Sequence, residues 1–327
     1  MDLTIPPGTE AFLNKAGWVG ATIEPLPGDA SFRHYFRIRR STGTAMLMYA
    51  PPPNEDQEPF IRSARWLEGN GMRAPIILAE QAGDGFVLLE DFGEVRMREY
   101  LDAWPQDEEE IYRVAIDALI KLRALPPGPF TNYTLAEYQR EARLFTEWYV
   151  PARELYVDGR SCGTAWDEAL APLLARQRPG VTVLRDYHAE NVMLLGGLEN
   201  QGLLDFQDAL VGHAAYDLVS LLQDARRDVS PDLETKMLDY YLAQTGEGED
   251  FRADYARLGA QRNAKIVGIF VRLWKRDGKP RYLDYIPRVW AAMERDLAHP
   301  ALAPVRAWFD ANIPADVRAN LGGTFAV

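Results

Sequence analysis

Three side chains with oxygen donors stand next to short apolar runs in the middle of the chain. Asp186 closely follows the run at 181–184, Asn191 comes five residues later, and Asp205 follows two leucines at 203–204. Apolar and β-branched runs of this length predict short strands, so the three side chains are expected at strand ends. One carboxylate can orient a hydroxyl group and accept its proton, while an amide and a second carboxylate can hold Mg²⁺ against phosphates. The set therefore suits phosphoryl transfer from ATP to a hydroxyl group.

The spacing of these residues is the catalytic-loop pattern of kinases, an Asp with an Asn five residues on and a metal-binding Asp after the next strand. Here the two segments read Leu-Arg-Asp-Tyr-His-Ala-Glu-Asn and Leu-Asp-Phe-Gln. An Asp and an Asn can also simply mark a turn between two strands. Asp205, between its own apolar flanks, favours the kinase interpretation, and so does the upstream half of the chain.

The bulk properties are those of a globular enzyme. The chain has 327 residues, 47% of them hydrophobic and 26% charged, with a net charge of −12. The negative charge argues against a nucleic-acid-binding surface. The single cysteine excludes an intrachain disulfide and a cysteine metal cluster. We expect no secretory signal and no membrane span, because the N-terminus lacks a basic and apolar leader and no apolar run reaches the required length. A cytoplasmic location is the expectation.

The first ninety residues are expected to be rich in strands. A hairpin over 26–38 has small residues at its tip, where backbone N–H groups can lie over phosphates, although an ordinary hairpin is the alternative. The segment 88–93 leaves a strand and is interpreted as a hinge, where backbone groups near Glu90 can pair with adenine. The other elements predicted here are strands at 44–50, 76–79 and 86–90 and a helix at 60–67.

From about residue 94 the chain is expected to be mainly helical. Apolar residues at helical spacing and charges that complement the helix dipole predict a helix that opens at Asp107 and ends before Pro126. Further helices are predicted at 134–150, 215–222, 231–244 and 251–275, and two shorter helices close the chain. The expected fold class is α+β.

Together these features resemble the aminoglycoside phosphotransferase family, which has a two-lobed protein-kinase-like fold. The resemblance covers almost the whole chain and rests on the hairpin at 26–38, the hinge at 88–93, the loop from Asp186 to Asn191, and Leu204-Asp-Phe-Gln-Asp. It implies an N-lobe of antiparallel sheet plus helix, residues 1–92, that binds the nucleotide. It also implies a larger, mainly helical C-lobe, residues 93–327, with the catalytic loop and the acceptor pocket.

More narrowly, three segments look like the bacterial kinases that phosphorylate the anomeric hydroxyl of N-acetylmuramate and N-acetylglucosamine in cell-wall recycling. They are Gly-Asp-Ala-Ser-Phe-Arg-His-Tyr-Phe-Arg at 28–37, Asp-Tyr-His-Ala-Glu-Asn at 186–191 and Leu-Asp-Phe-Gln-Asp-Ala at 204–209. This likeness implies an ATP- and Mg²⁺-dependent amino-sugar kinase. Other acceptors known in the family, aminoglycosides and alcohols such as choline or homoserine, stay open as alternatives.

The resemblance also implies roles for individual residues. Asp186 is the expected catalytic base, and Asn191 and Asp205 are the expected Mg²⁺ ligands. Asp217, in Tyr-Asp-Leu, is expected to brace the catalytic loop. The residues expected to contact the nucleotide are Ser31, Phe32 and Arg33 over the phosphates and Glu90 beside the adenine.

One departure from the family pattern concerns the lysine that usually contacts the phosphates from a strand. Its expected place, 46–50, reads Met-Leu-Met-Tyr-Ala, and its partner glutamate would fall near Phe60. The absence of both charged residues is physically reasonable, because one of them left alone in the protein interior would cost several kcal/mol of stability. Arg33, Arg37 or the metal ions are the candidates to neutralise the phosphates instead. The same departure motivates the alternative of a nucleotide-binding pseudokinase.

The acceptor side is less sharply defined by the sequence. His188 can contact the substrate or Asp205, or brace the loop, and Arg185 can bind developing charge or be an exposed cation. Lys265 and Arg262 can meet an acidic substituent, although a solvated helix face is the expected role of both. Asp208 can approach the sugar or a metal, or it can cap a turn. Glu147 can hydrogen-bond to a sugar and Trp148 can stack on it, although Trp148 is expected to pack in the core.

Overall fold

The computed structural model describes residues 4–27, 33–53 and 55–325. The chain divides into two compact units, and the division does not fall at a single chain position. The first unit contains Met1–Asp107 and Glu190–Ala209, and the second contains Glu108–Ala189 and Leu210–Val327. The functional lobes expected at 1–92 and 93–327 stay a prediction, because compactness alone does not show which residues hold a nucleotide.

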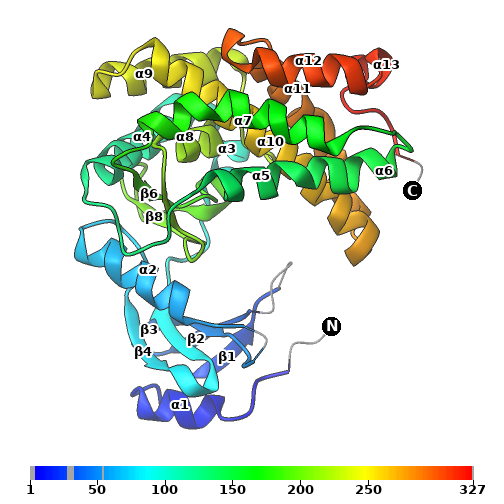
Figure 1. Cartoon of the computed structure of the whole chain (residues 1–327). Coiled ribbons are helices and arrows are strands. Elements are labelled where there is room, and N and C mark those ends of the chain that lie inside the picture. The colour runs from blue at the N-terminus through cyan, green and yellow to red at the C-terminus, as the bar shows by residue number, and fades with distance from the viewer. Residues whose placement is uncertain (1–3, 28–32, 54, 326–327) are drawn as a thin grey trace. The chain divides into compact units, whose positions relative to one another are not determined.

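The first unit is built on a five-stranded antiparallel sheet in the order β1-β2-β3-β5-β4 (Figure 1). Alternate residues of the central strands point to opposite faces, so Phe36, Leu47 and Leu88 share one face. Helix α1 supplies Phe12 and Leu13 to the core on that face. The strands are β1 Thr22–Pro25, β2 His34–Arg40, β3 Gly43–Tyr49, β4 Ile77–Gln81 and β5 Phe86–Glu90, and the helices are α1 Thr9–Lys15, α2 Glu58–Gly69 and α3 Met97–Ala103.

A β-hairpin from later in the chain completes the first unit. Strands β7 (Val192–Leu194) and β8 (Gln201–Leu203) pair antiparallel. The hairpin is tied to earlier segments by the Leu203 N–H, which donates to the Arg73 carbonyl at 2.8 Å, and by the Leu194 N–H, which donates to the Val95 carbonyl at 2.8 Å. These long-range backbone bonds explain why 190–209 belong to the unit of the sheet.

The second unit is mainly helical, with α10 (Glu249–Asp277) packed against several other helices. Most residues between Phe251 and Val271 are buried, so this helix runs through the core. A short strand pair, β6 (Val181–Val183) with β9 (Leu210–Gly212), accompanies the helices. They are α4 Glu108–Ala124, α5 Leu135–Leu144, α6 Val150–Ala152, α7 Gly159–Arg176, α8 Ala215–Leu222, α9 Pro231–Thr245, α11 Ile286–Leu297, α12 Ala303–Asn312 and α13 Ala315–Ala319.

The α+β class is confirmed, with the sheet in the first unit and the helices concentrated in the second. Three local predictions need correction. The segment 134–150, predicted as one helix, is α-helical only as far as Leu144 and continues as a π-helix at Phe145–Tyr149. Three α-helices, α11 to α13, rather than two close the chain. Helix α7 was not predicted. Helix α7 contains Pro172 and an N-terminal half rich in small residues, so its apolar periodicity is weak. None of the described helices has the length and apolar character needed to cross a membrane.

Candidate functional site

The loop that carries Asp186 is held by a buried carboxylate in the second unit. Asp217, on α8, accepts hydrogen bonds from the backbone N–H groups of Leu184 at 2.7 Å and Arg185 at 2.8 Å. On the other side of Asp186, the Tyr187 hydroxyl donates to the Ala115 carbonyl at 2.8 Å. The backbone before Asp186 is therefore anchored by Asp217, as expected, and the residue after Asp186 is anchored through its side chain.

Arg185 has a left-handed backbone conformation, with φ of 72°. Such a conformation costs a non-glycine residue about 1–3 kcal/mol and persists only when neighbouring contacts enforce it. Besides the bond to Asp217, the Arg185 carbonyl accepts from the Ser220 hydroxyl at 3.1 Å, and Arg262 donates to that hydroxyl at 2.7 Å. Arg262 is buried. The solvated position expected for Arg262 is therefore wrong, and its role is to support the loop through Ser220.

Asp217 is also fully enclosed by the protein. Burial raises the pKa of its carboxyl to about 7, while the N–H groups of Leu184 and Arg185 act in the opposite direction. Above this pKa the carboxylate is ionised and both of its oxygens accept a backbone hydrogen. The buried carboxylate is therefore best suited to hold the loop at neutral to mildly alkaline pH.

The Arg185 side chain is anchored rather than exposed. It donates to Glu141 of α5, and Lys265 lies 2.9 Å from the same carboxylate oxygen. The Tyr133 hydroxyl donates to the other oxygen of Glu141. Burial, the largest influence, raises the pKa of Glu141, but Lys265 and Arg185 outweigh it and lower that pKa to about 2. The readings of Arg185 as an exposed cation and of Lys265 as part of a solvated face are therefore wrong.

His188 is a buried, neutral member of the same loop. Only 4% of its surface is exposed, and burial lowers the pKa of the imidazole to about 4. Arg226 Nη1 lies 3.2 Å from His188 Nε2, so the neutral ring nitrogen accepts a hydrogen bond from the guanidinium. This contact fits the loop-bracing interpretation of His188.

The two expected metal ligands lie together at one end of the β7–β8 hairpin in the first unit. Asn191 precedes β7 and Asp205 follows β8, and the Leu204 N–H donates to the Asn191 carbonyl at 2.9 Å. This register places Asn191 Nδ2 3.4 Å from Asp205 Oδ2. Asp205 has φ of 57°, and Gln207 donates to its other carboxylate oxygen at 2.7 Å.

The donors of this pair fit magnesium. Mg²⁺ prefers oxygen ligands and usually takes one or two carboxylates together with substrate phosphates and water. Asn191 and Asp205 offer an amide oxygen and a carboxylate at one place. Among the described residues there is no cluster of three or more His, Cys, Asp or Glu side chains suited to a metal ion. An amide and a carboxylate are a donor set that suits Mg²⁺ held jointly with phosphate oxygens and water.

The nucleotide contacts expected from the sequence are described only in part. Ser31 and Phe32 lie outside the described residues. The Arg33 guanidinium is paired with Glu55, with Nη2 2.8 Å from Oε1. The Glu90 N–H donates to the Ile76 carbonyl at 2.9 Å. Because this N–H is already used within the sheet, an adenine contact by the N–H of Glu90 requires that bond to open.

The Glu90 side chain has a cationic neighbour at the end of β5. Arg73 Nη1 donates to its carboxylate at 2.7 Å, and this hydrogen bond is the main reason why the pKa of Glu90 is lowered. The Arg73 guanidinium also lies over the Phe92 ring, 4.7 Å from its centre. These contacts hold the Glu90 side chain and the segment that follows β5. The predicted contact with adenine involves backbone groups near Glu90, and it stays a prediction.

The places expected for the missing charge pair, the segment at 46–50 and the neighbourhood of Phe60, contain buried apolar side chains. Leu47, Met48 and Ala50 are buried, and Phe60 of α2 is 5% exposed and stacks on Phe206 with ring centres 5.1 Å apart. A single charge at either place would lack a partner. Arg37 is committed elsewhere, since its Nε lies 2.9 Å from Asp91 and its Nη2 donates to the Gly93 carbonyl at 2.9 Å.

The remaining acceptor candidates have few recorded contacts. Glu147 is exposed and Trp148 is half-buried, both on the π-helix at Phe145–Tyr149. Asp208 is exposed. Their proposed substrate roles stay predictions. Glu141, Ser220 and Glu55 were missed by the sequence analysis, because their partners lie 22 to 44 residues away along the chain.

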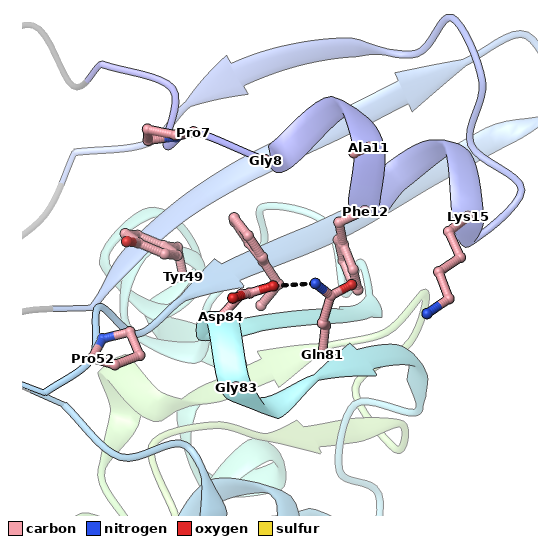
Figure 2. Close-up of a pocket in the computed structure, with 11 residues that line it drawn as sticks. Pro7, Gly8, Ala11, Phe12, Lys15, Tyr49, Pro52, Gln81, Gly83 and Asp84 are labelled. Carbon is pink, nitrogen blue, oxygen red and sulfur yellow. Dashed lines mark hydrogen bonds between the residues drawn. The ribbon is translucent and has the colours of Figure 1, made fainter.

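A cavity of about 690 Å³ lies in the first unit between α1 and the β4–β5 connection. Figure 2 shows Phe12, Tyr49 and Lys15 around it, with Gln81 hydrogen-bonded to Asp84. None of the predicted site residues lines this cavity. It is therefore separate from the residues discussed above.

Comparison with known proteins finds similar kinases and phosphotransferases. A kinase for N-acetylmuramate and N-acetylglucosamine from Caulobacter vibrioides is 36% identical, covering 94% of this chain and 96% of the relative. A kinase of the same name from Pseudomonas aeruginosa is 38% identical, covering 86% of each chain. The ADP-bound structure of the aminoglycoside phosphotransferase APH(2'')-Ib shares the fold, with a TM-score of 0.60 at 12% identity over 90% of this chain and 100% of that one.

The model of the phosphotransferase enzyme family, known as APH, matches residues 22–259. The match includes Asp186, Asn191, Asp205 and the brace Asp217. The kinase-like fold expected from the resemblance is confirmed. Because the family model matches most of the chain and relatives are similar over nearly their whole length, this chain belongs to the APH phosphotransferase enzyme family.

Proposed function

We propose that this protein is an ATP- and Mg²⁺-dependent kinase that phosphorylates the anomeric hydroxyl of N-acetylmuramate and N-acetylglucosamine. The observation that carries the proposal is the Asn191–Asp205 pair at the end of the hairpin, in a chain whose relatives of 36% and 38% identity are kinases of these two amino sugars. Nucleotide use is supported by family membership and by the ADP bound to a structural neighbour.

Asp186 is the proposed catalytic base. The loop residues beside it are held by Asp217 and by the Tyr187 hydroxyl, which supports a role in orienting the sugar hydroxyl and accepting its proton. In phosphoryl transfer most of the catalysis comes from positioning and charge neutralisation, because the transition state is loose. When bound by Asn191 and Asp205, Mg²⁺ supplies positive charge against the phosphate oxygens. His188 is less suited to be the base, because its side chain is buried and its Nε2 accepts a hydrogen bond from Arg226.

The proposal is tested by incubating the purified protein with Mg-ATP and single candidate acceptors, and locating the phosphate by ³¹P and ¹H NMR. We expect transfer to the anomeric oxygen of both amino sugars. Transfer to another hydroxyl, or only to an aminoglycoside, choline or homoserine, would contradict the proposed acceptor while leaving the family assignment intact.

A nucleotide-binding pseudokinase is the second candidate, and it is favoured by the lack of a lysine in the segment 46–50, where the usual phosphate-contacting lysine is expected. In that case the protein would bind ATP, with an affinity measurable by calorimetry, and transfer phosphate to none of the acceptors. The acceptor panel thus distinguishes the two functions in a single set of experiments.

A further inference from the structure

In the second unit, helix α10 packs along α5 and the π-helix that follows it (Figure 1). Three contacts fix how the two segments are aligned. They join Gln261 Nε2 to the Tyr138 carbonyl at 2.9 Å, Lys265 Nζ to Glu141 Oε1 at 2.9 Å, and Gly268 to the backbone of Leu144, so closely that a Cβ would collide. Because the contacts advance along both chains together, the two segments run in the same direction.

Arg272 is the next residue of α10 on this contacting face. It follows Gly268 by four residues, and residues four apart on a helix lie on the same side. The alignment therefore places Arg272 beside the π-helix at Phe145–Tyr149, which carries Glu147 and Trp148. Single π-helical turns of this kind are frequent at functional sites.

The Arg272 side chain has no hydrogen bond or ion pair with any of the described residues. The side chain is half-buried, and its Nε is enclosed by the protein without an acceptor, while the two terminal nitrogens are not enclosed. Burial, followed by the charge of Arg276, lowers the pKa of this guanidinium. A partly buried cation without a carboxylate partner is costly to a folded protein. An anion supplied by a ligand would remove this cost.

The other cations along this contact are held by carboxylates of the protein. Glu141 binds Lys265 and Arg185, Glu137 binds Arg140, and Asp277 binds Arg276. Glu147 forms no ion pair with Arg272, although it lies on the neighbouring π-helix. Arg272 is therefore the cation of this group whose charge is left for an external anion.

The same contact connects Arg272 to the proposed catalytic base. Glu141 accepts hydrogen bonds from Lys265 and from Arg185, the residue directly before Asp186. Arg272 follows Lys265 by seven residues, which is about 10 Å along the helix axis. A long arginine side chain and an amino sugar with a charged substituent can bridge this span together.

We propose that Arg272 binds the lactyl carboxylate of N-acetylmuramate and thereby sets the preference between the two amino sugars. N-acetylmuramate is N-acetylglucosamine with an added lactyl ether, so this carboxylate is the charge by which the two acceptors differ. The planar guanidinium matches the geometry of a carboxylate. This inference rests on the proposed amino-sugar kinase function and adds the residue that distinguishes its acceptors.

Kinetics with matched acceptors test the proposal. Initial rates with Mg-ATP are measured for N-acetylmuramate, its methyl ester and N-acetylglucosamine. We expect Arg272→Met to raise KM for N-acetylmuramate by about 10- to 100-fold, the effect of losing a charge-assisted hydrogen-bonded pair, with kcat nearly unchanged. KM for N-acetylglucosamine and for the ester, which both lack the charge, should not change. Arg272→Lys should recover part of the loss, because it keeps the charge but not the planar fork.

Arg276→Met is the matched control. It removes the same charge one turn further along α10, from an exposed position where Asp277 already binds it, and should leave all three acceptors unaffected. Stability is the second readout. Because Arg272 has no partner in the described part of the chain, Arg272→Met should keep or raise the urea midpoint. A lower midpoint together with an equal loss for all three acceptors would show a structural role and refute the proposal.

The outcomes separate this proposal from the proposed function. If the wild type phosphorylates both sugars and Arg272→Met uses N-acetylmuramate like the wild type, or loses both sugars equally, the function stands and the role of Arg272 is refuted. If the wild type phosphorylates neither sugar, calorimetry in the presence of ADP measures their binding. Selectively weaker binding of N-acetylmuramate by Arg272→Met then supports the carboxylate contact although the activity fails.

Nucleotide phosphates are the other anions that an arginine could bind in a kinase. Calorimetry with ATP in the absence of any sugar distinguishes the two. We expect Arg272→Met to bind ATP like the wild type. A selective loss of ATP affinity, or a wild type that does not bind N-acetylmuramate at all, would overturn the assignment of Arg272 to the acceptor.

Discussion

The bracing of the catalytic loop by Asp217 leads to a quantitative prediction for Asp217→Asn. The wild-type carboxylate accepts two backbone N–H groups, from Leu184 and Arg185. The amide of asparagine accepts only one, and its NH₂ group faces the other N–H, which is buried. Losing one bond to a charged acceptor and leaving one buried donor without a partner costs about 2–4 kcal/mol.

The functional consequence should be larger than the loss of stability alone explains. Arg185 keeps its left-handed conformation at a cost of about 1–3 kcal/mol, and the bond to Asp217 helps to enforce it. When that bond is lost, Arg185 can relax and displace the neighbouring Asp186. A misplacement of about 1 Å can lower the rate about 100-fold. We therefore expect kcat to fall by about 10- to 100-fold, with ATP affinity nearly unchanged.

The assay combines urea unfolding, ATP calorimetry and initial rates with Mg-ATP and N-acetylglucosamine at pH 8, where the wild-type carboxylate is ionised because its pKa is about 7. Asp254→Asn is the matched control. Asp254 is a fully buried carboxylate of α10 that binds Arg176 and Arg257, and its loss should reduce stability but not kcat. A wild-type kcat for folded Asp217→Asn would refute the bracing argument.

Three further predictions follow from single contacts. Asp186→Asn and Asp205→Asn should each nearly abolish turnover while circular dichroism shows the fold unchanged, and wild-type rates for Asp205→Asn with Mg-ATP would contradict the metal assignment. Glu141 has its pKa lowered from 4.5 to about 2, so the stability it contributes is present above pH 4.5 and is lost as the pH falls towards 2. Urea unfolding across this range should show a loss of stability that is about 3 kcal/mol smaller in Glu141→Gln than in the wild type. Gly85→Ala would place a Cβ 2.1 Å from the Ala50 carbonyl oxygen at φ of 80°, and should lower the free energy of unfolding by about 2–4 kcal/mol; an unchanged urea midpoint would contradict this.

Several elements followed from the sequence alone. The helix predicted at 215–222 and the strand predicted at 86–90 have those bounds in the structure. Both segments are strongly apolar and are bounded by turn residues or a change of pattern, so local preferences determine them. The family itself was identified in the same way, since the Asp186-to-Asn191 spacing and the segment at Asp205 are local features of the chain.

The partners of the site residues depended on the tertiary structure. Arg33 and Glu55 are 22 residues apart, and Arg185 and Glu141 are 44 apart. Arg262 was expected on a solvated face, but α10 is enclosed by other helices and buries it against Ser220. No local pattern encodes which distant charge a side chain will meet, because strand register and helix packing decide it.

The sequence by itself therefore determined the chemistry that the chain carries: the carboxylates, the amide and the absence of the strand lysine. The tertiary structure decided how those groups are held. It anchored the loop of Asp186 through a buried carboxylate, brought Asn191 beside Asp205 through a hairpin register, and paired Arg33 with Glu55. The physical reason is that residue types are local properties, whereas burial and charge pairing arise only when distant segments pack together.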